Sequence, residues 1–153
     1  MALNLFNYSQ PSAEVVGGED RILSGLTDEE WSDFLGAMER RVFPVGAEIL
    51  KAGDPDRTLY LIASGEVEVV IDGAAGRRRI ATVGAGSVVG EMSFFDGAPR
   101  SATVVALAAV EMLALRQDRF EQLAAWRPRI AIKLLTDLGR VLSQRVRKLN
   151  PTV

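Results

Sequence analysis

The segment GEMSFFDGAPRSATV, from Gly90 to Val104, places a glutamate and an arginine in the most apolar part of the chain. Between residues 81 and 115 the charged residues are Glu91, Asp96, Arg100 and Glu111. A guanidinium that is buried without an anion is energetically costly, so Arg100 needs a partner. The pattern leaves two candidates open. One is Glu91, in a salt bridge that closes the loop, and the other is an anion from outside the protein.

The residues on both sides of Arg100 favour the external anion. A glycine opens the short run Gly90–Phe95, which is suited to a single helical turn whose free N–H groups point at an anion. The Ser101 hydroxyl and the Ala102 N–H add donors beside the arginine, and together these groups match a phosphate. Glu91 would repel a phosphate at close range. Its natural role is to accept a hydrogen bond from a group attached to the phosphate, such as a ribose hydroxyl.

This segment lies in a region, residues 42–116, that is predicted to be rich in β-strands. Short apolar or β-branched runs alternate there with turn residues about every 8–12 positions, which predicts an antiparallel sandwich or barrel. Val67, Val69 and Ile71 alternate with Glu66, Glu68 and Val70, as expected for a half-buried strand. In such a fold most of the glycines are explained as turn formers.

Helices are predicted on both sides of the β-rich region. Thr27 and Glu30 have the spacing of a capping box, so a helix is expected over residues 27–41. A second helical region is expected over residues 117–149, where Pro128 suits the first turn of a new helix. Its apolar positions recur with helical spacing at Ala131, Leu134, Leu135, Leu138, Val141, Leu142, Val146 and Leu149.

The domain organisation follows from these elements. Residues 1–20 are interpreted as a flexible arm, and residues 21–153 as a single domain. The fold class is predicted as α+β. We expect an antiparallel β jelly-roll barrel of about eight strands, flanked by an N-terminal helix and two C-terminal helices.

Composition excludes several classes of function. The chain has 153 residues, a formal net charge of −2, no cysteine and no histidine. Thiolate nucleophiles, zinc-finger spacings and imidazole bases are therefore absent from the sequence, and no catalytic residue or metal ligand is predicted. The charge argues against a broad nucleic-acid-binding face. No apolar run of about 18 residues suggests a membrane span, and the absence of cysteine fits the cytoplasm.

The segment over residues 90–104 resembles the phosphate-binding cassette of the cyclic-nucleotide-binding domain family. That cassette reads G-E, two small or apolar residues, an apolar pair, a variable turn and then P-R-[S/T/A]-A-[S/T]-V. Its positions are filled here by Gly90, Glu91, Pro99, Arg100, Ser101, Ala102, Thr103 and Val104. Residues 45–54 and 59–65 are similar to a hairpin and a strand of the same family, so the resemblance extends in order from residue 27 to 149. Phe94 and Phe95 depart from the family's frequent leucine pair.

The resemblance implies a role for each cassette residue. Glu91 is expected to accept from the ribose 2′-hydroxyl, Arg100 to bind the exocyclic phosphate oxygens, and Gly90 to allow close approach. Backbone N–H groups and the Ser101 hydroxyl are expected to complete the phosphate site, with Val88 and Val89 lining the wall. The predicted ligand-binding residues are Val89, Gly90, Glu91, Met92, Ser93, Arg100, Ser101 and Ala102.

The resemblance also implies a helical lid over the base and a preferred nucleotide. Leu135, Leu138 and Arg140 are the candidate lid residues, and the alternative for each is packing on the strands or exposure to solvent. Arg145 is a further candidate for stacking on the base. Ser101 follows the arginine where family members selective for guanine often carry threonine. This favours cAMP over cGMP, although a serine hydroxyl could still reach a guanine amino group.

The function implied by the resemblance is a regulatory domain of signal transduction. It would bind cAMP, or cGMP, as a ligand rather than a cofactor, and would move its C-terminal helices when the ligand binds. Its protein partner would be an unidentified effector. An enzyme is not expected, because metal-dependent enzymes on similar barrels rely on histidines. The alternatives are a ligand-independent scaffold and a fragment of a larger cAMP-regulated transcription factor, channel or transporter. A homodimer along the C-terminal helix is left open, and no nucleic acid or membrane contact is predicted for this chain.

Overall fold

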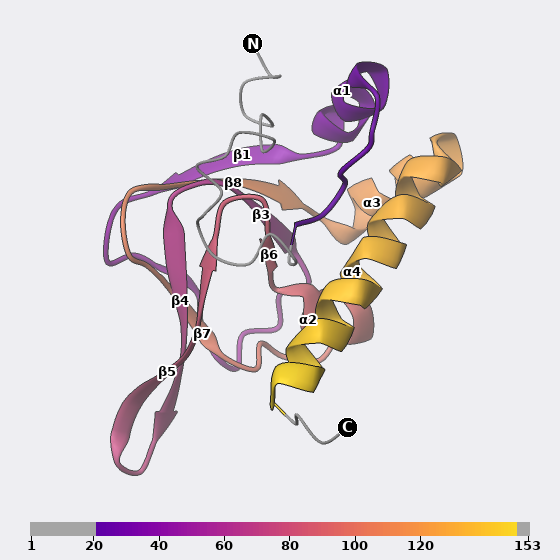
Figure 1. Cartoon of the computed structure of the whole chain (residues 1–153). Coiled ribbons are helices and arrows are strands. Elements are labelled where there is room, and N and C mark those ends of the chain that lie inside the picture. The colour runs from indigo at the N-terminus through magenta and orange to yellow at the C-terminus, as the bar shows by residue number, and fades with distance from the viewer. Residues whose placement is uncertain (1–20, 150–153) are drawn as a thin grey trace.

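The computed structural model describes residues 21–149 as an α+β domain of four helices and eight strands (Figure 1). The predicted arm over residues 1–20 lies outside the described residues. The helices are α1 (Asp28–Gly36), α2 (Glu91–Asp96), α3 (Gln117–Trp126) and α4 (Pro128–Leu149). The strands are β1 (Glu39–Phe43), β2 (Glu48–Leu50), β3 (Leu59–Ser64), β4 (Glu66–Gly73), β5 (Gly76–Gly84), β6 (Val88–Val89), β7 (Thr103–Ala106) and β8 (Val110–Leu115).

The strands form two four-stranded sheets, with the orders β1-β8-β3-β6 and β2-β7-β4-β5. Every strand pair is antiparallel. The predicted α+β class and the number of strands are therefore confirmed. Closure into one barrel is not part of the pairing, because within residues 21–149 no ladder joins one sheet to the other.

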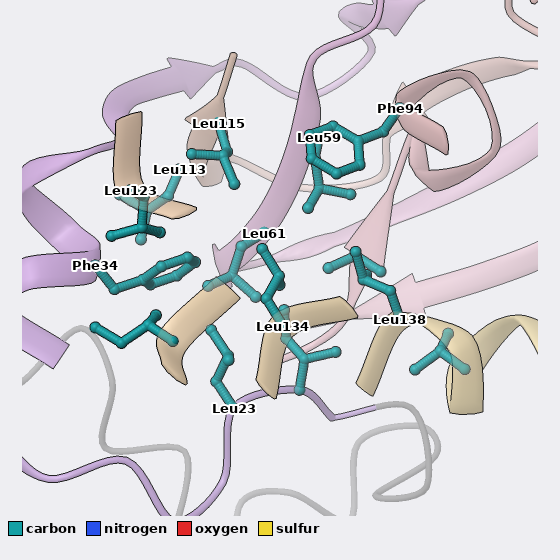
Figure 2. Close-up of a cluster of buried hydrophobic side chains, with 14 of the residues drawn as sticks. Leu23, Phe34, Leu59, Leu61, Phe94, Leu113, Leu115, Leu123, Leu134 and Leu138 are labelled. Carbon is teal, nitrogen blue, oxygen red and sulfur yellow. The ribbon is translucent and has the colours of Figure 1, made fainter. Parts of the chain in front are cut away.

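The core consists of two hydrophobic clusters that share β3. Leu59 and Leu61 lie in a cluster with residues of α1, α3 and α4, including Leu134 (Figure 2). Tyr60 and Ile62, the alternating residues, lie in the other cluster with residues of both sheets. Side chains of a strand alternate between its faces, so β3 is buried continuously from Leu59 to Ala63 because both of its faces are covered there. Each fully buried leucine contributes about 1.5–3 kcal/mol to this packing.

The first helix begins as predicted but is shorter than predicted. Thr27 caps it: its hydroxyl accepts from the Glu30 N–H at 3.1 Å, and the Glu30 carboxylate accepts from the Thr27 N–H at 3.1 Å. The expected extent of 27–41 is wrong, because α1 ends at Gly36 and Glu39–Phe43 pair with β8 instead. Glycine is a poor helix former, and the strand ladder outweighs the helical spacing of the following residues.

The alternation predicted for β4 is correct only in its first half. Val67 and Val70 are buried, whereas Val69 and Ile71 are intermediate. The register of β4 against β5 shifts between Val69 and Val70. The extra residue at this irregularity is Ile80 of β5, so the change in burial along β4 coincides with a feature of the neighbouring strand that a strict two-residue period cannot anticipate.

The two C-terminal helices occupy the predicted region. Pro128 is the first residue of α4, where its missing N–H breaks no helical hydrogen bond. Figure 1 shows α4, in yellow, running along one side of the strands with α2 beside its C-terminal half. None of the helices within residues 21–149 has the length and apolar character needed to cross a membrane.

Candidate anion site and the helix that covers it

Arg100 lies in the loop between α2 and β7 and is almost completely buried, with 4% of its surface exposed. One terminal nitrogen, Nη1, donates to the Gly90 carbonyl at 3.0 Å. The other, Nη2, donates to the Thr58 carbonyl at 2.6 Å and to Asp56 Oδ2 at 2.9 Å. Its Nε is the one buried side-chain polar atom within residues 21–149 that makes no hydrogen bond. The guanidinium is therefore held firmly and still has a donor to offer.

Asp56 is the internal counter-ion of Arg100. Burial alone would raise the pKa of its carboxyl. Hydrogen bonds from the Thr58 N–H and from Arg100 outweigh that effect and hold the pKa below its usual value. Asp56 is still 44% exposed at its side chain, whereas the Arg100 side chain is 2% exposed. The arginine is thus buried against a single carboxylate that water also reaches.

Gly90 makes the close packing around Arg100 possible. Its φ angle is 82°, in the left-handed region that residues with a side chain avoid. A Cβ atom at this position would lie 2.7 Å from Arg100 Nη1 and 2.9 Å from the Thr58 carbonyl oxygen. Glycine is therefore required twice, for the backbone turn that starts α2 and for the approach of the guanidinium.

The short helix α2 is held in place from its C-terminal end. Arg57 donates to the carbonyls of Ser93 at 3.2 Å and Phe94 at 2.9 Å. Gly97 ends the helix in a left-handed conformation and donates to the same Ser93 carbonyl. The Phe94 ring packs edge-on against Phe120 of α3, with ring centroids 5.3 Å apart. These contacts fix the direction in which α2 presents Glu91.

Glu91 is bound by an arginine from the far end of the chain. Arg145 of α4 donates to Glu91 Oε1 at 2.7 Å, and its other terminal nitrogen donates to the Val88 carbonyl at 3.0 Å and the Ser87 hydroxyl at 3.2 Å. Glu91 is 8% exposed as a residue. Neither sequence alternative for Arg100 describes the whole arrangement, because Arg100 is paired with Asp56 and Glu91 with Arg145.

The other predicted ligand-binding residues surround this centre. Val89 in β6 and Ser93 in α2 are buried. Met92 is exposed, and its sulfur lies 3.8 Å from the Ser101 hydroxyl, which is also on the exposed side. Ala102, just before β7, is partly buried. The structure brings Gly90, Glu91 and Arg100 together, and the nucleotide contacts assigned to the remaining residues stay predictions.

The base contacts assigned to Leu135, Leu138 and Arg140 stay predictions, and the three side chains differ in their surroundings. Leu138 is fully buried in the same cluster as Phe94 (Figure 2). Leu135 is 38% exposed, and Arg140 donates to the Arg21 carbonyl and to Gln144. Arg145 is the α4 residue that forms hydrogen bonds with the cassette.

Two partners at the site were not identified from the sequence. Asp56 follows Gly53, Asp54 and Pro55, where an aspartate is explained by turn chemistry alone. For Arg145 the sequence predicts stacking on a base, whereas the structure pairs it with Glu91. The helical spacing of Arg145 does predict that it faces the strands, because Leu138, Val141 and Arg145 fall on one face of α4. A cation at the end of a buried stripe indicates an acidic partner on the opposing surface.

Comparison with known proteins identifies relatives of this fold and site. A family model described as "Cyclic nucleotide-binding domain" matches residues 40–125. The cyclic AMP receptor protein of Thermus thermophilus is 36% identical over 124 residues, which are 80% of this chain and 57% of that protein. The cAMP-dependent protein kinase regulatory subunit of Colletotrichum orbiculare is 32% identical over 102 residues, which are 67% of this chain and 26% of that protein. The chain thus spans little more than half of the first relative and about a quarter of the second.

Solved structures show the same relationship. A cyclic nucleotide-binding domain from Methylobacillus flagellatus KT has a TM-score of 0.77 and 37% identity, covering 85% of this chain and 74% of that one. The catabolite activator protein of Thermus thermophilus has a TM-score of 0.72 and 35% identity, covering 83% of this chain and 58% of that one. The regulatory domain of Toxoplasma gondii PKA, crystallised with cAMP, has a TM-score of 0.58 and 26% identity, covering 64% and 38%.

Proposed function

Because this chain belongs to the cyclic nucleotide-binding domain family, we propose that it is a regulatory module that binds cAMP at Gly90, Glu91 and Arg100. The observation that carries the proposal is the buried guanidinium of Arg100, with an Nε that lacks a partner within residues 21–149. A phosphate oxygen would satisfy this donor with a charge-assisted hydrogen bond. The single, partly exposed counter-ion Asp56 leaves room for a second anion.

The ribose is assigned to Glu91 in this proposal. Arg145 binds Oε1 of that carboxylate, so a ribose hydroxyl must either use the remaining lone pairs or displace the arginine. We assign displacement, because the ribose and the guanidinium would approach the same partly covered carboxylate. When Arg145 leaves, α4 also loses its hydrogen bonds to Val88 and Ser87. Nucleotide binding would thereby favour a state in which the C-terminal half of α4 is released, which differs from the closed lid over the base that the family resemblance implies.

The preference for cAMP over cGMP is supported by Ser101 and by the relatives. Ser101 stands directly after the arginine, is exposed and contacts Met92 rather than a neighbouring strand. Two relatives are named for cAMP, and a similar structure was crystallised with it. Binding of cGMP with lower affinity is the expected behaviour.

A regulatory role is favoured over catalysis by the state of the carboxylates. Glu91 and Asp56 each accept a hydrogen bond from an arginine, so both carboxylates already serve as acceptors inside the protein rather than standing free beside a substrate. The output would be the position of α4, read by an effector protein in the cytoplasm. Because the chain covers only part of its curated relatives, the identity of that effector is not assigned.

A homodimer along α4 is a second part of the proposal. The positions Ile132, Leu135, Gly139, Leu142, Val146 and Leu149 follow the alternating three- and four-residue spacing of a coiled-coil seam. Ile132, Val146 and Leu149 are 64%, 53% and 84% exposed, so the seam is free to pack on another surface. A second copy fits because it presents the same seam, uninterrupted by charge.

The proposal is tested by calorimetric titration with cAMP, cGMP and 5′-AMP. Wild type should bind cAMP more tightly than cGMP and should bind 5′-AMP weakest. Arg145→Leu should bind cAMP roughly three- to tenfold more tightly, because the competing ion pair is gone. Lys148→Leu, an exposed change on the same helix, should bind like wild type. Weaker binding by Arg145→Leu would contradict displacement, and tighter binding of cGMP would contradict the assigned preference.

A further inference from the structure

Residues 21–23 connect α4 to the strands through two consecutive backbone amides. The Ile22 N–H donates to the Gly86 carbonyl at 3.2 Å, in the turn that leads into β6. The next amide, of Leu23, donates to Asp137 Oδ2 of α4 at 2.7 Å. Residues 22 and 23 are therefore hydrogen-bonded on one side to the turn before β6 and on the other side to α4.

The conformation of Leu23 shows that this connection is strongly enforced. Its φ angle is 60°, and it is the one non-glycine residue within residues 21–149 with a positive φ. For a leucine this backbone conformation is unfavourable and persists only when the surroundings determine it. Leu23 is fully buried, in the cluster that contains Leu134 and Leu138 of α4. Core packing and the bond to Asp137 together hold the strained residue.

The side chains of α4 are arranged to receive the segment. Asp137 is 5% exposed, and its second oxygen accepts from Lys133 Nζ at 3.2 Å. A buried carboxylate is costly unless it is paired and hydrogen-bonded, and here both requirements are met. One turn further along, Arg140 donates to the Arg21 carbonyl. Asp137 is not among the predicted ligand-binding residues, and Arg140, a candidate lid residue, donates here to the main chain of Arg21.

We infer that residues 21–23 form a clip that holds α4 in its docked position and opposes its release by nucleotide. Successive Cα atoms are about 3.8 Å apart, so the Ile22–Gly86 and Leu23–Asp137 bonds cannot both survive a larger separation of α4 from the strands. The clip thereby contributes to the free-energy difference between docked and released α4. That difference in turn sets the apparent nucleotide affinity, a consequence that rests on the proposed function.

The clip itself is tested by amide hydrogen exchange without nucleotide. Asp137→Ala should speed exchange of the Leu23 amide by about ten- to a hundredfold, the loss expected for a buried hydrogen bond. Exchange over residues 141–148 should also accelerate, because α4 is less firmly docked. Asp137→Asn keeps an oxygen for Leu23 and should restore protection, and Thr136→Ala, its exposed neighbour, should change nothing. Unchanged exchange in Asp137→Ala would overturn the clip, whatever the protein binds.

The effect of the clip on regulation is tested by cAMP affinity. Asp137→Ala should bind cAMP roughly three- to tenfold more tightly than wild type, whereas a protein that is merely destabilised would bind more weakly. Arg140→Ala, an exposed change that preserves the core, should shift affinity in the same direction by a smaller factor. Combined with Arg145→Leu, the gain from Asp137→Ala should be smaller than on its own, since both changes release α4.

The outcomes distinguish the clip from the proposed function. Altered exchange in a protein that binds no nucleotide, even as wild type, would retain the clip as a tether of α4 and refute the cAMP site. Suppose that wild type binds the nucleotide and that Asp137→Ala and Arg140→Ala both bind it with equal or lower affinity. That result would refute the regulatory role of the clip and leave the nucleotide site in place.

Discussion

At the level of single residues, Arg100 is supported by a few neighbours that leave its Nε without a hydrogen-bond partner within residues 21–149. Backbone bonds from Arg100 to Asp54 and from Gly53 to Arg100, both at 2.8 Å, fix its main chain. The carbonyls of Gly90 and Thr58 fix its side chain. Most of the arginine's hydrogen-bonding capacity is thus used to hold it still, so that an incoming anion meets a guanidinium that is already oriented.

Gly90→Ala tests the glycine that admits Arg100. The left-handed backbone alone should cost about 1–2 kcal/mol, and the new methyl group would also collide with the Thr58 carbonyl, which cannot move independently. We expect the free energy of unfolding to fall by at least about 2 kcal/mol. We also expect cAMP binding to become too weak to measure. Gly36→Ala, which has open space and helical backbone, is the matched control and should be neutral or stabilising. Unchanged stability and affinity in Gly90→Ala would show that Arg100 and the Thr58 carbonyl do not pack tightly against residue 90.

The Asp56–Arg100 pair predicts a pH dependence of stability. The pKa of Asp56 is lower in the folded protein than in the unfolded chain, so the pair stabilises the fold above the unfolded pKa. That contribution is lost as pH falls through the lower, folded pKa. Asp56→Asn should therefore be less stable than wild type at pH 7, and the difference should shrink below about pH 4. Urea unfolding at several pH values measures the difference in the free energy of unfolding between wild type and Asp56→Asn. A difference that grows as the pH falls would contradict the stabilising role of the Asp56–Arg100 pair.

At the scale of elements, local signals predicted where structure begins better than where it ends. The capping box of Thr27 and Glu30 is a contact between near neighbours, so four residues suffice to predict it. The cassette was identified because its glycine, glutamate and arginine lie within one short segment. The end of α1 and the irregularity in β4 depend on pairing with distant strands, which a local pattern does not contain.

Thr27→Ala tests the start of α1. The change removes the side-chain acceptor for the Glu30 N–H and should lower the free energy of unfolding by about 0.5–2 kcal/mol. Ser32→Ala, at an exposed position within the same helix, should be neutral or slightly stabilising. Thermal and chemical unfolding of the two variants gives the comparison. Equal stability would mean that packing rather than capping determines where α1 begins.

At the scale of the whole molecule, contacts between residues far apart in sequence decide how the site works. Arg145 lies 54 residues from Glu91, and Asp137 lies 114 residues from Leu23. Glu91 and Arg100 could be chosen from the sequence because apolar surroundings make a charge conspicuous. The partners of these residues could not, since a glutamate can be matched by any arginine that the fold brings near.

The exposed seam of α4 predicts self-association. Wild type should form a dimer in sedimentation velocity at tens of micromolar, an expectation for a short coiled-coil seam. Val146→Glu places a charge at an exposed position near the C-terminal end of the seam and should shift the protein to a monomer without lowering its melting temperature. Lys148→Glu, outside the seam on the same turn, should leave the dimer intact. A wild-type monomer over the whole concentration range would contradict this interface.

Titration of Arg100 variants with cAMP measures whether this arginine binds the phosphate of a cyclic nucleotide. Wild type and Arg78→Leu, a change at an exposed arginine on β5, should bind cAMP alike. Arg100→Leu should lose binding by at least about a hundredfold, and Arg100→Lys should lose part of it, because lysine keeps the charge without the fork. Wild-type affinity in a folded Arg100→Leu protein would show that Arg100 does not bind the phosphate, and no cAMP binding by wild type would rule out the cAMP site.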